Sequence, residues 1–197
     1  MNQIHDAKVL LVGSGLTATL ASDFDLTGWL VVALHHGWQA LPPDRWDKFL
    51  HCHDAPDEMK PKITRPQQQQ IINTLHDYIY AQKYREHYTR EFRRQSGYCR
   101  TIFLTGLWWA IQNTQPNIIG TIGCDMYYPG DDKNTFYGTG TCDPLLHDPR
   151  DMQRWLGFAM GYCHAQGIEL VNFSPKDSPT VLPFEHRQFQ EILCCAS

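Results

Sequence analysis

The sequence predicts an α/β fold built on one Rossmann-like domain over residues 1–197, with a mostly parallel sheet and helices on both of its faces. Two observations support this class. The chain has 197 residues, of which 42% are hydrophobic, which is enough for one sizeable core. Short apolar runs rich in β-branched residues also alternate with longer segments of helical spacing. Such alternation is typical of a parallel sheet whose connections cover it.

Five short runs are the expected strands, because each is apolar and bounded by turn residues. They are residues 8–12, 29–34, 50–52, 117–122 and 168–173, of which 50–52 is the weakest. Segment 105–112 is expected to be a helix that turns Trp108 and Trp109 toward a core. Segment 148–166 is expected to be another, with Pro149 in its first turn and Gly167 ending it.

Residues 67–95 contain no glycine or proline, and their apolar residues recur at helical spacing. These are Ile71, Ile72, Leu75, Ile79 and Tyr80. We therefore expect a helix that begins in the glutamine run 67–70, and we interpret residues 67–100 as a helical insertion.

The loops that follow the strands carry residues suited to phosphate or ribose contacts. They are Gly13-Ser14-Gly15, His35-His36, residues 123–127 and residues 174–176. In a parallel sheet such loops collect at the carboxyl edge, where ligands bind. The sequence therefore predicts a nucleotide-type ligand at this edge.

Gly13-Ser14-Gly15 has three interpretations. It is half of a dinucleotide fingerprint, but Ala18 stands near the place of the third glycine, which disfavours a Rossmann dehydrogenase. It is also consistent with a plain turn. We favour a glycine turn whose backbone N–H groups approach a phosphate.

Metal and disulfide chemistry are not expected. Residues His51, Cys52 and His53 lack the paired spacing of zinc ligands, and the seven cysteines are odd in number and scattered. We expect the cysteines to be small buried residues in a reducing cytoplasm. No apolar run approaches the ~20 residues of a membrane span. The net charge of −4 excludes a generally basic nucleic-acid coat.

A basic stretch interleaved with aromatic residues occupies positions 83–100. Its cations are Lys83, Arg85, Arg90, Arg93, Arg94 and Arg100. A solvated helix face is one interpretation. The other is contact with an anionic acceptor through Arg90, Arg93 and Arg94, the acceptor being a glycan, a lipid phosphate or a nucleic acid.

The succession of these pieces resembles the bacterial sialyltransferases that cap lipooligosaccharides, and their nucleotide-sugar-binding relatives. The matching segments are Val12-Gly-Ser-Gly-Leu-Thr17, Thr105-Gly106, Gly123-Cys-Asp-Met-Tyr127, Phe136-Tyr137, Leu146-His147-Asp148 and Phe173-Ser174-Pro175. The match covers nearly the whole chain and rests on order and spacing. The first turn lacks the family's Asn and Pro, and His35 or His36 stands where the family has Asn.

The resemblance implies metal-independent glycosyl transfer from a nucleotide sugar to an acceptor hydroxyl, without a cofactor. By this resemblance His147 is the general base, and Tyr127 and Tyr137 stabilise the departing phosphate. Neutral hydroxyl donors can replace a metal in that role. The nucleotide-binding positions are Gly13, Ser14, Gly15, His35, His36, Thr105, Gly106, Gly123, Asp125, Ser174 and Pro175.

Two other functions remain open from the sequence. One is a nucleotide- or nucleic-acid-binding protein of the same fold without transferase activity. The other is a pyrophosphokinase-like enzyme, for which Asp125, Asp131 and Asp132 are the candidate Mg²⁺ ligands.

Overall fold

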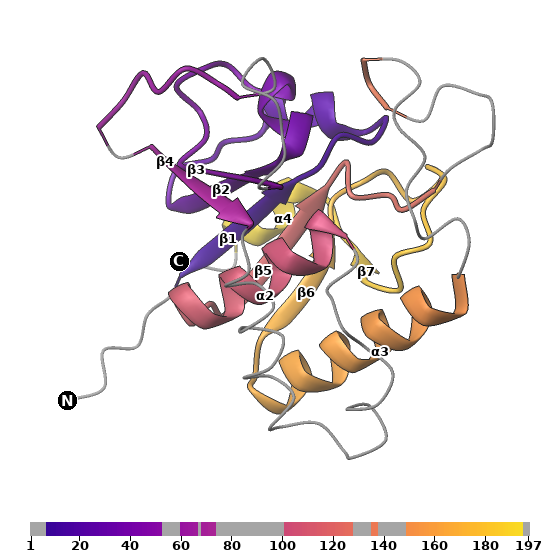
Figure 1. Ribbon diagram of the computed structural model, residues 1–197. Coiled ribbons are helices and arrows are strands. Elements are labelled where there is room, and N and C mark those ends of the chain that lie inside the picture. The colour runs from indigo at the N-terminus through magenta and orange to yellow at the C-terminus, as the bar shows by residue number, and fades with distance from the viewer. Residues whose placement is uncertain are drawn as a thin grey trace.

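The α/β class is confirmed by a seven-stranded parallel sheet in the computed structural model, in the order β4-β3-β2-β1-β5-β6-β7 (Figure 1). The structure describes residues 7–52, 60–66, 68–73, 101–127, 135–137 and 149–194. The strands are β1 (Lys8–Val12), β2 (Trp29–Leu34), β3 (Lys48–Cys52), β4 (Gln69–Asn73), β5 (Ile118–Ile122), β6 (Glu169–Asn172) and β7 (Glu185–His186).

The central strand β1 lies between β2 and β5, so that Lys8 is level with both Trp29 and Ile118. All five strands predicted from apolar runs are confirmed, with bounds that differ by one or two residues at most. Two of the seven strands were not predicted, β4 and β7. β7 has only two residues, which carry no periodicity from which a strand can be recognised.

Two long helices cover one face of the sheet, α2 (Ile102–Thr114) and α3 (Pro149–Ala165). They pack on alternate strand residues that include Val9, Leu11 and Val32. Trp108 is buried in this layer, as predicted, and Trp109 packs against it while partly exposed. Gly167 follows α3 with φ +70°, the left-handed conformation that ends helices.

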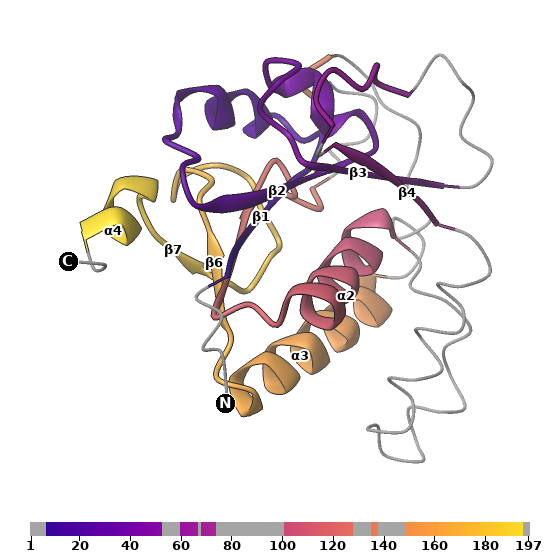
Figure 2. The ribbon, with the colours of Figure 1, turned by 90° about the vertical axis from the view of Figure 1, so that its left-hand side faces the viewer.

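The opposite face is covered by shorter elements, so helices lie on both faces (Figure 2). They are the 3₁₀ helices η1 (Ala18–Asp23) and η2 (His35–Ala40), and α4 (Phe189–Cys194). Strand residues Leu10, Val12 and Val31 point into this layer. Phe189 of α4 packs there against Trp29 and Phe173, with ring centroids 5.2 and 5.0 Å away.

The predicted helix start in the glutamine run is wrong. Residues 69–73 form β4, which pairs in parallel with β3 so that Leu50 is level with Ile71. The adjacent isoleucines 71 and 72 fit either secondary structure, and pairing with the edge of β3 decides the outcome. Residue 67 and residues 74–100, the remainder of the expected insertion, lie outside the described residues.

The strand order reverses between β1 and β5. The chain runs from β1 through β2 to β3 on one side, and from β5 through β6 to β7 on the other. The connection after β1 passes to the face of η1, whereas the one after β5 leads to α3 on the opposite face. In open α/β sheets ligands bind outside the strand ends at such a reversal. In the described part of the chain, no helix is long and apolar enough to cross a membrane.

Candidate functional site

The glycine turn after β1 lies directly against the backbone after β5. The Gly13 N–H donates to the carbonyl of Ile122 at 2.9 Å, and the Gly15 N–H donates to that of Gly123 at 2.7 Å. A Cβ at position 13 would come within 2.8 Å of the Gly123 carbonyl carbon and 3.0 Å of Cys124 Sγ. Glycine is therefore required for strand-end packing. Of the backbone N–H groups that we expect to approach a phosphate, those of Gly13 and Gly15 donate to the backbone after β5.

Ser14, which lies between the two glycines, has hydrogen-bond donors that no described residue engages. Its carbonyl accepts the Phe136 N–H at 3.2 Å, which brings residues 135–137 to the turn. Its own N–H and hydroxyl have no partner among the described residues, and the residue is partly exposed. Of this turn, Ser14 is the residue best placed to donate to a ligand.

A buried carboxylate joins the ends of β1, β5 and β6. Asp125 Oδ1 accepts from the Thr17 hydroxyl at 3.1 Å and from the Ser174 hydroxyl at 2.9 Å. The two hydroxyl oxygens are themselves 2.8 Å apart, and Thr17 Oγ1 accepts the Gly123 N–H at 3.1 Å. All three side chains are buried. We call Asp125, Thr17 and Ser174 the Asp125 cluster.

Burial raises the pKa of Asp125 above its ordinary value. Hydrogen bonds from Ser174 and Thr17, and the charge of His186, offset part of that increase. The Asp125 carboxyl is bonded to Thr17 and Ser174 within the cluster, so it ties three strand ends together. The same bonds leave it poorly placed as the Mg²⁺ ligand that a pyrophosphokinase-like enzyme needs.

The raised pKa of Asp125 predicts a pH dependence of stability. Above the ordinary value of 3.8 the unfolded chain loses this proton while the folded protein still holds it. The folded state then binds more protons, so the free energy of unfolding falls as the pH rises toward the raised pKa. Below 3.8 the contribution is fully present. For Asp125→Asn we expect the free energy of unfolding, measured with urea, to fall less steeply across this pH range. Parallel curves for the variant and the wild type would contradict this.

Two of the three left-handed non-glycine residues among those described lie at this edge, and the third, Gln115, ends α2. His35, after β2, and Met126, after β5, have φ of 48° and 53°, which non-glycine residues rarely adopt. Gly123 beside them has φ 64°. The left-handed conformation costs a non-glycine residue about 1 kcal/mol or more, and such residues persist where the surrounding structure enforces them, often at ligand sites.

Two tyrosine side chains in these segments are exposed. Tyr127 and Tyr137 are 42% and 43% exposed. The His36 ring lies 4.7 Å from that of Tyr137 between centroids, and burial lowers the pKa of His36 below 6.5. A neutral His36 therefore packs on Tyr137 at pH 7. The structure thus brings predicted residues from the ends of β1, β2 and β5 to one edge, together with residues 135–137.

Other predicted residues serve packing. The Thr105 hydroxyl donates to the carbonyl of Thr101 at 3.2 Å within α2. Gly106 lets α2 approach β2, since a Cβ there would lie 2.6 Å from Leu34 Cδ2.

Pro175 is exposed beside Ser174. The predicted base His147, the acceptor residues Arg90, Arg93 and Arg94, and the carboxylates Asp131 and Asp132 lie outside the described residues.

Two residues of this edge were missed from the sequence. Thr17 belongs to the Asp125 cluster, but a lone threonine after a glycine turn has no distinguishing spacing. His186 ends β7, and its Nδ1 lies 3.0 Å from the carbonyl oxygen of Ser174. A strand prediction for residues 185–186 would have been needed to place it at the edge.

Within the described residues no three His, Cys, Asp or Glu side chains gather as a metal site requires. His51 is buried and stacks on Phe49, with centroids 4.9 Å apart. Cys124 and Cys163 are free and buried, which confirms the expected role for these two. Burial raises the pKa of both thiols, that of Cys163 to about 12, so they are poor nucleophiles.

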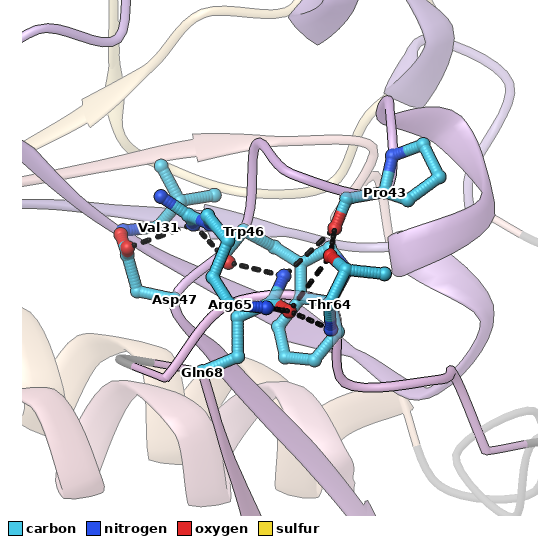
Figure 3. A network of polar contacts seen from close by, with 7 residues as sticks. All are labelled: Val31, Pro43, Trp46, Asp47, Thr64, Arg65 and Gln68. Atoms are coloured by element: carbon cyan, nitrogen blue, oxygen red, sulfur yellow. Dashed lines mark hydrogen bonds and ion pairs between the residues drawn. The ribbon is translucent and has the colours of Figure 1, made fainter.

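A cavity of about 330 Å³ lies away from the predicted site residues, near the first half of β2. It is lined by Asp25, Leu26, Thr27, Trp29, Val31, Asp44, Arg45, Asp47 and Arg65. An adjoining polar network centres on Gln68, whose amide donates to the carbonyls of Pro43 and Trp46 at 2.7 and 3.0 Å (Figure 3). The Gln68 Oε1 accepts the N–H groups of residues 64 and 65. These bonds hold together the loops that precede β3 and β4.

Comparison of the chain with protein-family models, with curated proteins and with solved structures finds no match.

Proposed function

We propose that the protein binds a nucleotide sugar at the carboxyl edge of its sheet and transfers the sugar to an acceptor hydroxyl without a metal. One observation carries the proposal. The Asp125 cluster joins the strand ends of β1, β5 and β6 where the strand order reverses. The order β3-β2-β1-β5-β6-β7, which β4 extends at one edge, supports the proposal that the sheet is Rossmann-like.

The described residues supply the donors that a departing nucleotide needs. The Ser14 N–H and hydroxyl are available for a phosphate beside the turn. Tyr127 and Tyr137 are exposed, and their hydroxyls are proposed to donate to the phosphate oxygens, on which negative charge grows as the sugar leaves. His36 packs on the Tyr137 ring and orients it.

In the proposed reaction the acceptor oxygen forms a bond with the anomeric carbon while the bond from that carbon to the phosphate oxygen breaks. The nucleotide leaves with the electron pair, and His147 takes the acceptor's proton. Arg90, Arg93 and Arg94 are proposed to attract an anionic acceptor. These four residues come from the sequence alone, by resemblance for His147 and by charge pattern for the arginines.

Heat stability in the presence of CMP-, UDP- and GDP-sugars tests the proposal. A ligand at one hundred times its Kd stabilises a protein by about 2.7 kcal/mol, which raises the Tm by several degrees. We expect at least one nucleotide sugar to do so, with EDTA present. Ser14→Ala should weaken the shift, whereas Ser22→Ala, exposed in η1, should not.

The same samples separate the alternatives. Sugar released or transferred from the bound donor supports a transferase, whereas binding without turnover supports a nucleotide-binding protein. The proposal fails if no nucleotide sugar stabilises the protein.

A further inference from the structure

His186 stands at the carboxyl edge beyond the groups used above. It is the last residue of β7 and lies level with Asn172, the last residue of β6. The side chain is partly exposed. Its neighbour in space is the backbone of Ser174, whose hydroxyl belongs to the Asp125 cluster.

One hydrogen bond fixes the chemistry of the ring. His186 Nδ1 lies 3.0 Å from the Ser174 carbonyl oxygen, and a carbonyl oxygen only accepts. The proton of the neutral ring is therefore on Nδ1, and Nε2 is left as an acceptor. Among the described residues Nε2 has no hydrogen-bond partner and is not one of the atoms sealed from solvent.

An acceptor at this position selects among the parts of a nucleotide sugar. Phosphate oxygens are ionised and offer no proton, so the Nε2 lone pair does not bind them. Hydroxyl groups donate, and both the ribose and the transferred sugar carry them. β7 lies three strands from β1. Since neighbouring strands are about 4.8 Å apart, a ligand whose phosphate lies near Ser14 must extend over roughly 14 Å to reach β7.

We propose that His186 Nε2 accepts a hydrogen bond from a hydroxyl of the bound nucleotide sugar, on the ribose or on the transferred sugar. The inference rests on the proposed function. It makes His186 a specificity-determining residue for the donor, with its orientation set by Ser174 and by the cluster that positions Ser174.

Two substitutions separate the two ring nitrogens. The amide nitrogen of His186→Asn occupies the place of Nδ1, so this variant keeps the bond to Ser174 and loses the acceptor. The amide oxygen of His186→Gln reaches the place of Nε2, so this variant retains an acceptor there. The matched control is His164→Asn, an exposed histidine in the last turn of α3.

Titration calorimetry measures the Kd of each variant for the nucleotide sugar that stabilises the wild type, for its free nucleotide and for the 2′-deoxy form. We expect His186→Asn to raise the Kd for the nucleotide sugar by about three- to tenfold, with an unchanged Tm. His186→Gln should recover part of the affinity. If the ribose carries the donating hydroxyl, His186→Asn also weakens binding of the free nucleotide but not of its 2′-deoxy form. If the transferred sugar carries the donating hydroxyl, the variant weakens binding of the nucleotide sugar alone.

The inference is overturned if His186→Asn binds the nucleotide sugar as the wild type does, or if His164→Asn weakens it equally. The proposed function survives that result as long as the wild type binds. If the wild type binds none of the nucleotide sugars, the proposed function falls and this inference falls with it.

Discussion

Replacing His147 by alanine is expected to abolish glycosyl transfer while donor binding and folding stay intact. Loss of a general base typically lowers the rate by about 100- to 10,000-fold. The residue precedes α3 within Asp143-Pro-Leu-Leu-His-Asp-Pro149, a polar and proline-containing segment typical of a partly exposed connection. Turnover measured with the nucleotide sugar that stabilises the wild type, together with its Kd and the Tm of the variant, checks all three expectations.

His164→Ala is the matched control, because His164 is exposed in the last turn of α3 and belongs to no proposed site. Its turnover should equal that of the wild type. A His147→Ala variant with near wild-type turnover would show that the base does not lie at this position.

Replacing Gly13 by alanine should produce a large loss of stability. The added Cβ would lie 2.8 Å from the Gly123 carbonyl carbon and 3.0 Å from Cys124 Sγ. The backbone after β1 and β5 is fixed there by hydrogen bonds, so the two strand ends must separate. Forcing an extra methyl group into a packed interior costs about 1–3 kcal/mol, and contact with backbone favours the upper end. Urea unfolding measures the loss.

Gly157→Ala serves as the control for the same chemical change. Gly157 is exposed in α3, and nothing lies within 4 Å of the position of its Cβ. Alanine in the middle of a helix is more stable than glycine by about 0.5–1 kcal/mol, so this variant should gain stability. Similar effects of the two substitutions would contradict the proposed packing of the Gly13 turn.

Much of the sheet could be predicted because its central strands are buried on both faces. Residues 8–12, 29–34 and 117–122 are therefore mostly apolar runs, a pattern typical of strands buried in a parallel sheet. The sequence predicts a helix where β4 forms, because β4 is a strand through its pairing with β3 and a local sequence pattern does not show that pairing. β7 and α4 are short, and packing holds them more than their own sequence does.

The candidate site was predictable in location and less so in chemistry. Strand-end loops must meet at one edge of a parallel sheet, so residues 13–15, 123–127 and 174 came together as expected. Sequence alone does not tell whether a glycine serves a ligand or a neighbouring strand, and Gly13 and Gly15 serve β5. Asp125 was assigned to the ligand, yet its bonds run to Thr17 and Ser174.

Hydrogen–deuterium exchange with and without the stabilising nucleotide sugar tests the central claim most directly. If the ligand binds at the carboxyl edge, slowed exchange should concentrate in peptides that cover residues 13–20, 123–127 and 172–178. Peptides from the second half of α3 should not change. Slowed exchange confined to the cavity beside Trp29, Asp47 and Arg65, or no change at any of the three edge segments, would contradict the account.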